Sequence, residues 1–446
     1  MSETPKPTTV PLRWMGTPRT EAQHSPLQLS PQFARALPLA LYIHIPWCVR
    51  KCPYCDFNSH VVREGAAQAN NDAIGKARVQ PPSQPHTGPH ALPEDEYVAA
   101  LIADLEAALP NIWGRRISSI FFGGGTPSLF SAEAIEQILT AVRMRTNLQP
   151  DAEITLEANP GTVEAARFAG YRDAGVTRVS LGIQSFNDRH LAALGRIHSA
   201  SEAQRAIELA QQHFAEVNLD IMYALPEQSL DEALHDVDRA IACGTTHLSC
   251  YHLTLEPNTP FAAHPPAVPD DDVAADMQLA IEQRLQAAGY EHYETSAFAK
   301  AGHRCKHNLN YWQFGDYLGI GAGAHSKLSF HDRVQREMRH KHPAAYLQAV
   351  QQGTTHGATQ GAHIQITEVV NGDALPFEFM MNALRLCDGF PLDLFEERTG
   401  LPLRVVQPLL KQAEQRGLLA LTANAAKPTE QGRRFLNELL QIFLVE

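Results

Sequence analysis

Three cysteines lie close together near the start of the chain, in the stretch IHIPWCVRKCPYCDF. Cys48, Cys52 and Cys55 form a C-x3-C-x2-C array directly after residues 41–45, a short apolar run with the length of a β-strand. Thiolates on one loop can each hold one iron of a cubane iron-sulfur cluster. Three ligands leave the fourth iron open, and an open site on a metal can bind a substrate or cofactor. The array therefore predicts a [4Fe-4S] cluster with one iron available to a chelating amine and carboxylate.

A structural zinc knuckle is the alternative interpretation of the same cysteines. Tetrahedral zinc needs a fourth Cys or His, and zinc sites usually pair two C-x2-C units. This chain has one such unit, formed by Cys52 and Cys55. The spacing favours the cluster over zinc.

The composition bounds the class of protein. The chain has 446 residues, of which 44% are hydrophobic, so it is long enough for one large domain and a smaller one. Lys and Arg number 37 against 49 Asp and Glu, a net charge of -12 without a basic run, so no nucleic acid partner is expected. The 7 cysteines are odd in number and mostly isolated, so they do not form the pattern of a disulfide framework. They suit a protein of the reducing cytoplasm. No apolar run approaches the ~18 residues of a membrane span, so no transmembrane segment is expected.

Two segments have the composition of disordered chain. Residues 1–38 are rich in Pro, Thr and Gln and lack the apolar core of a signal peptide, which predicts a disordered N-terminal tail. A second segment, at about 60–94, contains the cluster PPSQP and predicts a flexible surface insertion. This insertion separates the cysteine array from the first expected helix.

Strand and helix patterns alternate from residue 39 onward. Strands are expected at 41–45, 117–122, 153–156, 178–183, 217–223 and 247–253. Helical spacing fills the intervals, and strands that alternate with helices pair in parallel through right-handed crossovers. We therefore expect an α/β fold in which residues 39–330 form a partial, TIM-like (β/α)6 barrel. The chemistry of such barrels gathers at the C-terminal ends of the strands.

Polar residues or glycines stand at four of these strands. The run GGGTP at 123–127 follows the second strand, and its glycines allow backbone to approach a ligand that a Cβ would exclude. Glu157 ends the third strand, Gln184 ends the fourth, and Asp220 lies in the fifth. A single acid after a strand is commonly a helix cap or a turn former. Four such features in register with the cysteine array instead favour one ligand pocket.

Six stretches resemble a known family. They are, in order, IHIPWCVRKCPYCDF, FFGGGTPSL, EANPGT, RVSLGIQSF, NLDIMYALPEQS and YHLTLEPNTPF. Together they resemble the oxygen-independent coproporphyrinogen III oxidase family of radical S-adenosylmethionine (SAM) proteins, over roughly residues 40–326 and more weakly to the C-terminus. In this family the methionine end of SAM chelates the open iron, and reduction cleaves the sulfonium to a 5'-deoxyadenosyl radical. The resemblance thus implies a radical SAM barrel with SAM as a second cofactor.

The resemblance also implies roles for individual residues. It places the cluster on Cys48, Cys52 and Cys55. The residues that it places against SAM are Tyr42, Tyr54, Gly124, Gly125, Thr126, Glu157, Gln184, Arg196, Asp220 and Thr254. Carboxylates suit ribose hydroxyls or an amine, and a guanidinium suits a carboxylate.

The residues after the third cysteine separate two branches of the family. The anaerobic oxidase branch is similar to this chain but has a fourth cysteine in a C-x-C ending, whereas Cys55 here is followed by Asp56 and Phe57. The branch that ends in Cys-Asp-Phe is the HemW group, which is described as haem chaperones. A cluster on three cysteines is still compatible with cleavage of SAM, so whether the chain is an enzyme stays open.

A second motif points to the same branch. The stretch CKHNLNYW at 305–312 contains an H-N-x-x-Y-W signature that resembles the haem-associated motif of the HemW group. Imidazole is a common axial ligand of haem iron, so His307 is the candidate haem ligand. The alternative is a packed loop in which His307 bonds to backbone and Trp312 fills a gap in the core.

The end of the chain has a different pattern. After a connecting segment at 331–373, residues 374–446 show short helical stretches around a Leu-Leu-Ala-Leu-Thr run. This pattern predicts a small, mainly helical, winged-helix-like C-terminal domain. Many such folds bind DNA, but no basic recognition helix is present, so a lid or partner-docking role is expected.

The expected function is that of a cytoplasmic haem chaperone. Such a protein would bind haem, a [4Fe-4S] cluster and SAM, and would transfer haem to acceptor haemoproteins, in solution or at a membrane. The alternative is an oxygen-independent coproporphyrinogen III oxidase, which the missing fourth cysteine disfavours. A radical enzyme that acts on an unrelated substrate is a third interpretation.

Overall fold

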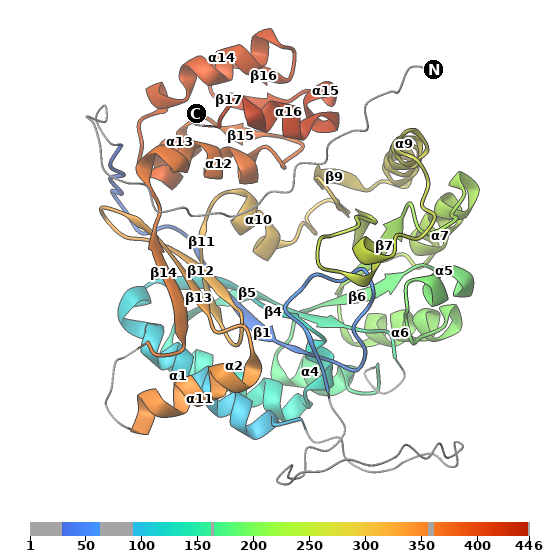
Figure 1. The fold of residues 1–446 in the computed structure, drawn as a ribbon, viewed down its shortest axis with the longest axis horizontal. Coiled ribbons are helices and arrows are strands. Elements are labelled where there is room, and N and C mark those ends of the chain that lie inside the picture. Colours follow the sequence, from blue (N-terminus) through green and yellow to red (C-terminus); the bar gives the residue numbers. More distant parts are fainter. Residues whose placement is uncertain (1–28, 63–91, 162–164, 356–360, 445–446) are drawn as a thin grey trace.

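A 12-stranded mixed sheet runs through the protein (Figure 1). The computed structural model describes residues 29–62, 92–161, 165–355 and 361–444. The central strands lie side by side in chain order and pair in parallel. They are β1 (Leu39–Ile45), β4 (Arg116–Gly124), β5 (Asn147–Ala158), β6 (Arg178–Gln184), β7 (Glu216–Tyr223) and β8 (His247–His252). Each overlaps a strand that the sequence predicts, so the α/β fold with a partial (β/α)6 barrel is confirmed.

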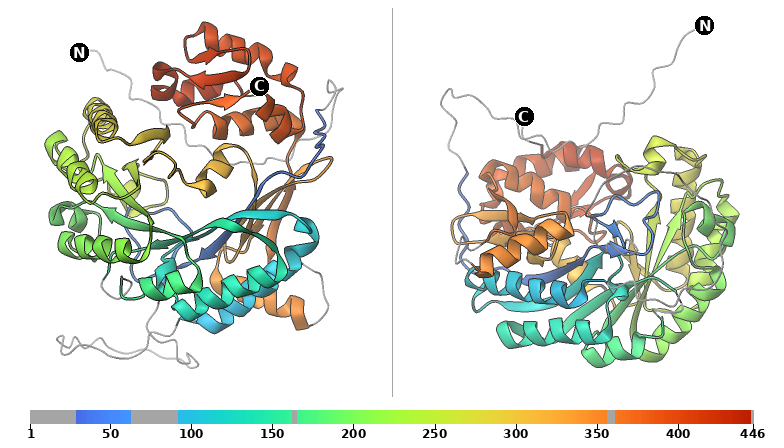
Figure 2. Two further views of the ribbon diagram at one scale, coloured as in Figure 1. Left: turned by 180° about the vertical axis from the view of Figure 1, so that it is seen from behind. Right: turned by 60° about the horizontal axis from the view of Figure 1, so that its bottom comes forward.

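Helices join these strands and cover the outer side of the barrel (Figure 2). The connections contain α1 (Glu94–Ile112), α2 (Ala132–Arg145), α4 (Phe168–Ala174), α5 (Asp188–Ala193), α6 (Ala200–His213) and α7 (Leu230–Ala242). Helices α6 and α7 begin at capping boxes, in which Ser199 pairs with Glu202 and Ser229 pairs with Glu232. Helix α9 (Asp271–Ala287) follows β8 and packs on α7.

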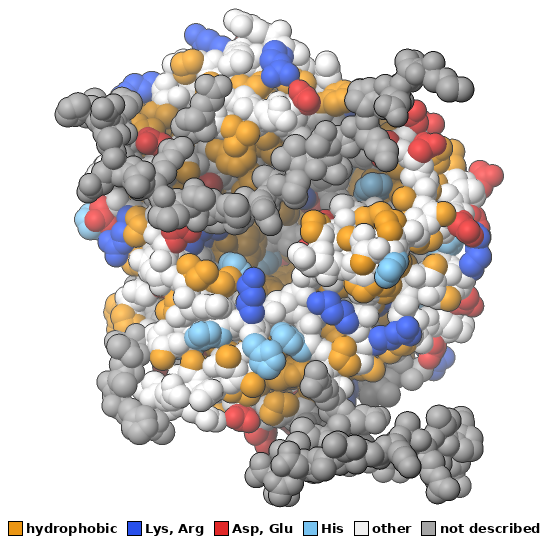
Figure 3. Space-filling view, in the orientation of Figure 1, with side chains coloured by type: hydrophobic (Ala, Val, Ile, Leu, Met, Phe, Trp, Pro, Cys, Tyr) orange, Lys and Arg blue, Asp and Glu red, His pale blue; other side chains and the backbone are white. Residues whose placement is uncertain are grey.

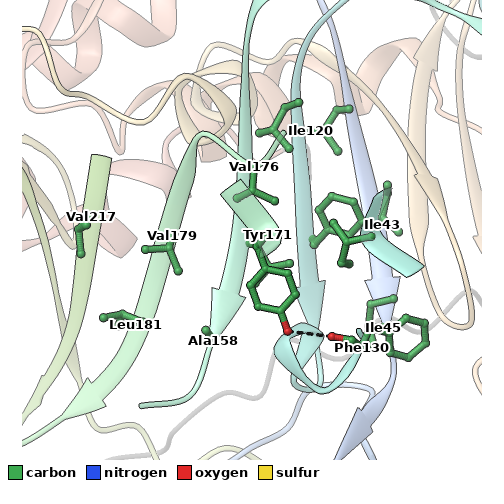
Figure 4. Close-up of a cluster of buried hydrophobic side chains, with 14 of the residues drawn as sticks. Ile43, Ile45, Ile120, Phe130, Ala158, Tyr171, Val176, Val179, Leu181 and Val217 are labelled. Atoms are coloured by element: carbon green, nitrogen blue, oxygen red, sulfur yellow. Dashed lines mark hydrogen bonds between the residues drawn. The ribbon is translucent and has the colours of Figure 1, made fainter. Parts of the chain in front are cut away.

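The main core lies between the barrel strands and these helices (Figure 4). Ile43 and Ile120 on neighbouring strands are fully buried, and so is Val179 on β6. The hydroxyl of the buried Tyr171 on α4 donates to the Phe130 carbonyl oxygen at 2.8 Å. Strands that are covered on both faces form nearly continuous apolar runs, which is why the sequence locates them.

The sheet continues beyond the barrel on both sides. Next to β1 lie β11 (Asp316–Ile320), β12 (His325–Ser329), β13 (Val334–Arg339) and β14 (Ile364–Val369), and next to β8 lie β10 (Ala297–Ala299) and β9 (Glu291–Glu294). Strand β11 is parallel to β1, and the other added pairs are antiparallel. The sequence does not predict these strands, because short polar stretches such as VQREMR in β13 lack a clear apolar alternation.

The C-terminal unit has a core of its own. It contains α12 (Leu375–Ala383), α13 (Asp393–Thr399), α14 (Gln407–Gln415), α15 (Glu430–Arg434) and α16 (Leu436–Gln441). A small antiparallel sheet of β15 (Phe390–Pro391), β17 (Ala425–Pro428) and β16 (Leu419–Leu421) packs with them. The mainly helical character of this unit, with a hairpin before its last helices, agrees with the sequence.

Residues 29–38, which the sequence assigns to the N-terminal tail, contact the C-terminal unit. Leu29 and Phe33 pack against its core, and the Gln32 N–H donates to the Gly400 carbonyl oxygen at 2.9 Å. The rest of that tail and most of the expected insertion fall outside the described residues. Within the described ranges, no helix combines the length and the apolar character that a membrane span needs.

A network of buried hydrogen bonds and ion pairs joins α1 to β13 and α11 (Pro343–Thr355). Asp104 is fully buried and accepts hydrogen bonds from Arg339 of β13 at 3.2 Å and from the Tyr346 hydroxyl of α11 at 2.9 Å. Nε2 of His363 lies 3.0 Å from the same carboxylate. Burial raises the pKa of Asp104, but Arg339 and His363 outweigh burial and hold this pKa at about 2. Asp104 is therefore ionised in the folded protein at neutral pH.

Replacing Asp104 by alanine should destabilise the fold strongly. D104A leaves Arg339 buried without its partner, and removal of one member of a buried pair costs about 3–5 kcal/mol. Chemical denaturation should show this loss as a lower unfolding midpoint. E106A is the matched control, because the Glu106 side chain on the same helix is 51% exposed and its pair with Arg145 contributes at most about 1 kcal/mol. Equal midpoints for D104A and the wild type would show that the network does not stabilise the fold.

Candidate functional site

A cavity of about 440 Å³ opens at the C-terminal ends of the parallel strands. Among the residues that line it are Cys48, Cys52, Tyr54, Cys55, Gly124, Gly125, Thr126, Glu157, Gln184, Arg196, Asp220 and Thr254. Figure 3 shows a face of the molecule that is hollowed at its centre, with hydrophobic side chains inside the hollow and Lys, Arg and His side chains along its lower edge. The strand ends thus bring together every predicted site residue except Tyr42 and His307.

The three cysteines lie on one closed loop. Cys48 belongs to the short strand β2 (Trp47–Cys48), which pairs in parallel with β3 (His60–Val61). The Cys55 N–H donates to the Cys52 carbonyl oxygen at 3.2 Å, so the last two thiols share a tight turn. Burial raises the pKa of the Cys48 thiol, and the charges of Cys55 and Cys52 raise it further.

This arrangement suits a cluster better than a single ion. Among the described residues, no three His, Cys, Asp or Glu side chains are placed to hold one metal ion. A structural zinc ion would need such a set. A cubane does not, because each thiolate binds a different iron.

The end of β4 supports the loop through its backbone. The Gly125 N–H donates to the Ile45 carbonyl oxygen, and the Thr126 N–H donates to the Trp47 carbonyl oxygen, each at 2.7 Å. A Cβ on Gly125 would lie 2.5 Å from the Trp47 oxygen. Glycine is therefore required where the sheet continues onto the residue that precedes Cys48.

A chain of polar side chains connects two of the cysteines. Arg196 donates to the Cys52 sulfur at 3.6 Å and to the Asn159 side-chain oxygen at 2.7 Å. Asn159 donates to the Thr126 hydroxyl at 3.1 Å, and this hydroxyl donates to the Cys48 sulfur at 3.6 Å. Donors to sulfur favour the ionised thiolate that iron binds. The sequence does not predict a role for Asn159, because an Asn before Pro is an ordinary turn residue.

Two carboxyl groups face the cavity without an ion pair to a described residue. Burial and the nearby Asp220 raise the pKa of Glu157 to about 8, although the Gly124 N–H lowers it. Burial also raises the pKa of Asp220, against hydrogen bonds from Ser180 at 3.0 Å and Asn218 at 2.8 Å. A cationic ligand that also carries hydroxyl groups would supply the partners that these acids lack.

Tyr42 lies behind the cavity wall. Its hydroxyl is 3.0 Å from Nδ1 of His44, and its ring stacks on Phe121 with centroids 6.4 Å apart. Phe121 lines the cavity, so Tyr42 supports the wall without forming its surface.

Gly124 packs closely against the His44 ring. Its φ is +115°, and a Cβ there would lie 2.5 Å from that ring, so a larger residue would not fit at this position.

The other predicted residues reach the cavity from strand ends and loops. Gln184 has a positive φ of 67° at the end of β6, a conformation that is uncommon outside glycine and often marks a functional site. The Tyr54 ring packs on Phe261 with centroids 6.4 Å apart. Thr254 is exposed at the rim.

Known proteins resemble this chain along nearly all of its length. Residues 42–240 match the Radical SAM superfamily, and residues 370–435 match the HemN C-terminal domain. The heme chaperone HemW of Escherichia coli K12 is 46% identical over 411 residues, which cover 92% of this chain and 99% of that protein. The heme chaperone HemW of Haemophilus influenzae is 47% identical over 415 residues, which cover 92% and 98%. The chain belongs to the HemW family.

A solved structure shares the fold of this HemW family protein. The coproporphyrinogen III oxidase HemN from Escherichia coli superposes with a TM-score of 0.71 over 92% of this chain and 90% of that chain, at 21% identity. At this level of identity the likeness concerns the fold alone. It agrees with a radical SAM barrel that is followed by a HemN-type C-terminal domain.

His307, the predicted haem ligand, is deeply buried in this HemW family protein. It lies on α10 (Lys306–Trp312), is 2% exposed, and its Nδ1 is 3.0 Å from the Ser119 hydroxyl. Its ring stacks on Phe121 with centroids 4.9 Å apart, and burial lowers its pKa to about 3. Nε2 has no hydrogen-bond partner among the described residues. The structure does not bring His307 to the surface of the cavity.

A methyl group on Gly125 should disturb the cysteine loop. In G125A the added Cβ meets the Trp47 carbonyl oxygen, so the backbone that precedes Cys48 has to shift. After anaerobic reconstitution, iron and sulfide per protein should fall by more than about half because the ligand geometry is lost. G353A is the control, because a Cβ on Gly353 in α11 meets nothing within 4 Å. Wild-type iron content in G125A would show that the loop relaxes around the methyl group.

Proposed function

We propose that this protein is a haem chaperone, which binds haem and passes it to acceptor haemoproteins. The observation that supports the proposal most is identity of 46% and 47% to two proteins named heme chaperone HemW, over 92% of this chain. The ending Cys55-Asp56-Phe57 points the same way, since the oxidase branch is expected to have a fourth cysteine there.

The same proposal includes a [4Fe-4S] cluster and SAM as resident cofactors. Cys48, Cys52 and Cys55 suit the cluster because they share one loop, and because Thr126 and Arg196 donate to two of the sulfurs. When bound, the cluster and SAM supply an electron and a source of a 5'-deoxyadenosyl radical.

The cavity residues would bind and orient SAM. Arg196 stands beside Cys52 and suits the carboxylate of the methionine end. Glu157 and Asp220 form no ion pair with a described residue and suit the amine or the ribose hydroxyls. The glycine run at the end of β4 leaves room for a ligand where side chains would fill the space.

Haem would dock near this site and be released under the control of the cluster or of SAM. The mainly helical C-terminal unit is the part of the chain that suits contact with an acceptor, as a lid or a docking surface. The rival function, oxidation of coproporphyrinogen III, is supported by likeness of fold to HemN, and fold alone does not assign chemistry.

Haem binding and porphyrinogen oxidation should separate in one experiment. Anaerobically reconstituted protein is titrated with haem, and separately incubated with coproporphyrinogen III, SAM and a strong reductant. The expected result is a Soret band that saturates at about one haem per chain, transfer of that haem to apomyoglobin, and no decarboxylated porphyrin. A variant without the cluster, C48A/C52A/C55A, shows which of these steps needs the cluster. Formation of protoporphyrinogen without tight haem binding would favour the oxidase.

SAM should bind more tightly as the pH rises toward 8. Glu157 has a pKa of about 8 without a ligand, and a cationic ligand favours the ionised carboxylate. Below pH 8 binding must therefore release a proton from Glu157, and this cost disappears above pH 8. Calorimetry in buffers of different ionisation enthalpy measures the released proton. The release should be smaller in E157Q than in the wild type and unchanged in D151N, whose side chain is 80% exposed.

If E157Q releases the same number of protons as the wild type, Glu157 is not the group that responds to SAM. The amine of SAM titrates as well, so the comparison between the variants, not the absolute release, decides the result.

A further inference from the structure

We infer that Arg178, Thr155 and Asn308 form a subsite for a carboxylate group, at the end of the cavity that lies away from the cysteines. Arg178 begins β6 and Gln184 ends it, and both residues line the cavity. At about 3.3 Å per residue, the cavity therefore extends roughly 20 Å along this strand. The proposed function uses the part between the cysteines and Asp220 and leaves the end at Arg178 without a role.

Arg178 is buried without a hydrogen-bond acceptor. It is 3% exposed and lines the cavity. None of its N–H groups donates a hydrogen bond to a described residue, and its ion pair with Glu216 is long, at 3.9 Å. A guanidinium stays protonated when it is buried, so its charge is costly where no acceptor is present. A ligand that supplies an acceptor would lower this cost.

The acids near Arg178 are already bonded to other groups. Glu216 accepts a hydrogen bond from the Thr246 hydroxyl at 3.1 Å. Glu153, whose charge also acts on Arg178, accepts one from the Lys306 N–H at 3.0 Å. Both acids offset part of the positive charge of Arg178. A carboxylate at this place would therefore gain more from directed hydrogen bonds to the guanidinium than from net charge.

Two more polar groups at this end lack partners. Thr155 on β5 is the direct neighbour of Arg178 in the parallel pairing, and it is 1% exposed. Its hydroxyl forms no hydrogen bond with a described residue. The side-chain amide of Asn308 on α10 forms none either. Asn308 lines the cavity one turn after Cys305, whose thiol is close enough to Arg178 to act on its charge. Groups from two strands and one helix therefore face the same space.

The neighbouring polar residues bond to one another instead. Asn218 accepts hydrogen bonds from Nδ1 of His247 at 2.6 Å and from the Ser249 hydroxyl at 3.1 Å. Its side-chain amide donates to the Ser180 hydroxyl at 2.8 Å. These four residues also line the cavity, and they hold one another in place. The lack of partners is thus specific to the three residues of the subsite.

The three residues determine the chemistry of the ligand. A guanidinium binds both oxygens of a carboxylate side by side, and the Thr155 hydroxyl and the Asn308 amide can donate to the same group. Under the proposed function, on which this step rests, the carboxylate is a propionate of haem. Asn308 directly follows His307, the candidate haem ligand, so a haem held by α10 would lie beside the cavity. A small free acid carries the same group without a porphyrin.

Two variants weaken the hydrogen bonds of the subsite. T155V removes only a hydroxyl that has no partner in the ligand-free protein, so its unfolding midpoint should not fall. R178K keeps the charge but loses the planar arrangement of donors. T140V is the matched control, because Thr140 is exposed on α2. All proteins are full-length with a reconstituted cluster, and equal iron content shows that they are folded. If R178K does not fold, T155V decides the result.

Each protein is titrated with haem and with haem dimethyl ester, in which the propionates are blocked. The wild type and T140V should bind haem at least about tenfold more tightly than the ester, because a hydrogen-bonded charged group contributes on this order. T155V and R178K should lose most of this preference. Their affinity for haem should fall, while their affinity for the ester should not change.

A titration with succinate separates the two sources of the carboxylate. If succinate binds to the wild type but not to T155V or R178K, and haem and its ester bind equally, the subsite holds a small free acid. If no succinate binds, and the preference for haem over the ester is absent or is the same in all proteins, water alone solvates Arg178 and the inference is wrong. If the wild type takes up no haem, the proposed function fails, and the subsite then stands only if the variants lose succinate that the wild type binds.

Discussion

The site depends on backbone hydrogen bonds that carry the sheet past the end of β1. Gly125 and Thr126 donate to Ile45 and Trp47 at 2.7 Å, so the cysteine loop is a continuation of the barrel rather than a free surface loop. A loop fixed in this way loses less conformational entropy when it binds a cluster, because its backbone is already ordered. It also fixes the position of Cys48 relative to Glu157 and the other strand ends.

Arg196 and the two acids Glu157 and Asp220 line the same cavity, but they differ in how they are paired with other groups. Arg196 is held among the Cys52 sulfur, Asn159 and the Gly182 carbonyl oxygen, so it is oriented before any ligand arrives. Glu157 and Asp220 are instead raised in pKa by burial, so that ionising either of them costs free energy as long as no ligand is bound. A ligand with cationic and hydroxyl groups would lower the cost of ionising Glu157 and Asp220. A carboxylate at its other end would pair with Arg196.

The sequence predicts the barrel and most of the cavity, because strands covered on both faces form apolar runs and because polar residues at their ends meet at one edge. It does not predict β12 to β14, whose polar residues such as Arg336 and Glu337 show no apolar period. The HNLNYW motif draws attention to His307, but it does not predict that this side chain is buried, since the spacing of residues along a chain does not report their depth in the fold. Asn159 is missed for a related reason: its role depends on contacts with Thr126 and Arg196, which are distant in the sequence.

The shared fold of this protein and HemN limits where a difference in function can arise. Both have the barrel and the C-terminal domain, so neither distinguishes a chaperone from an oxidase. The difference must therefore lie in individual side chains rather than in the arrangement of helices and strands. In this chain one such difference follows the third cysteine, where Asp56 and Phe57 stand in place of the fourth cysteine that is expected in the oxidase branch.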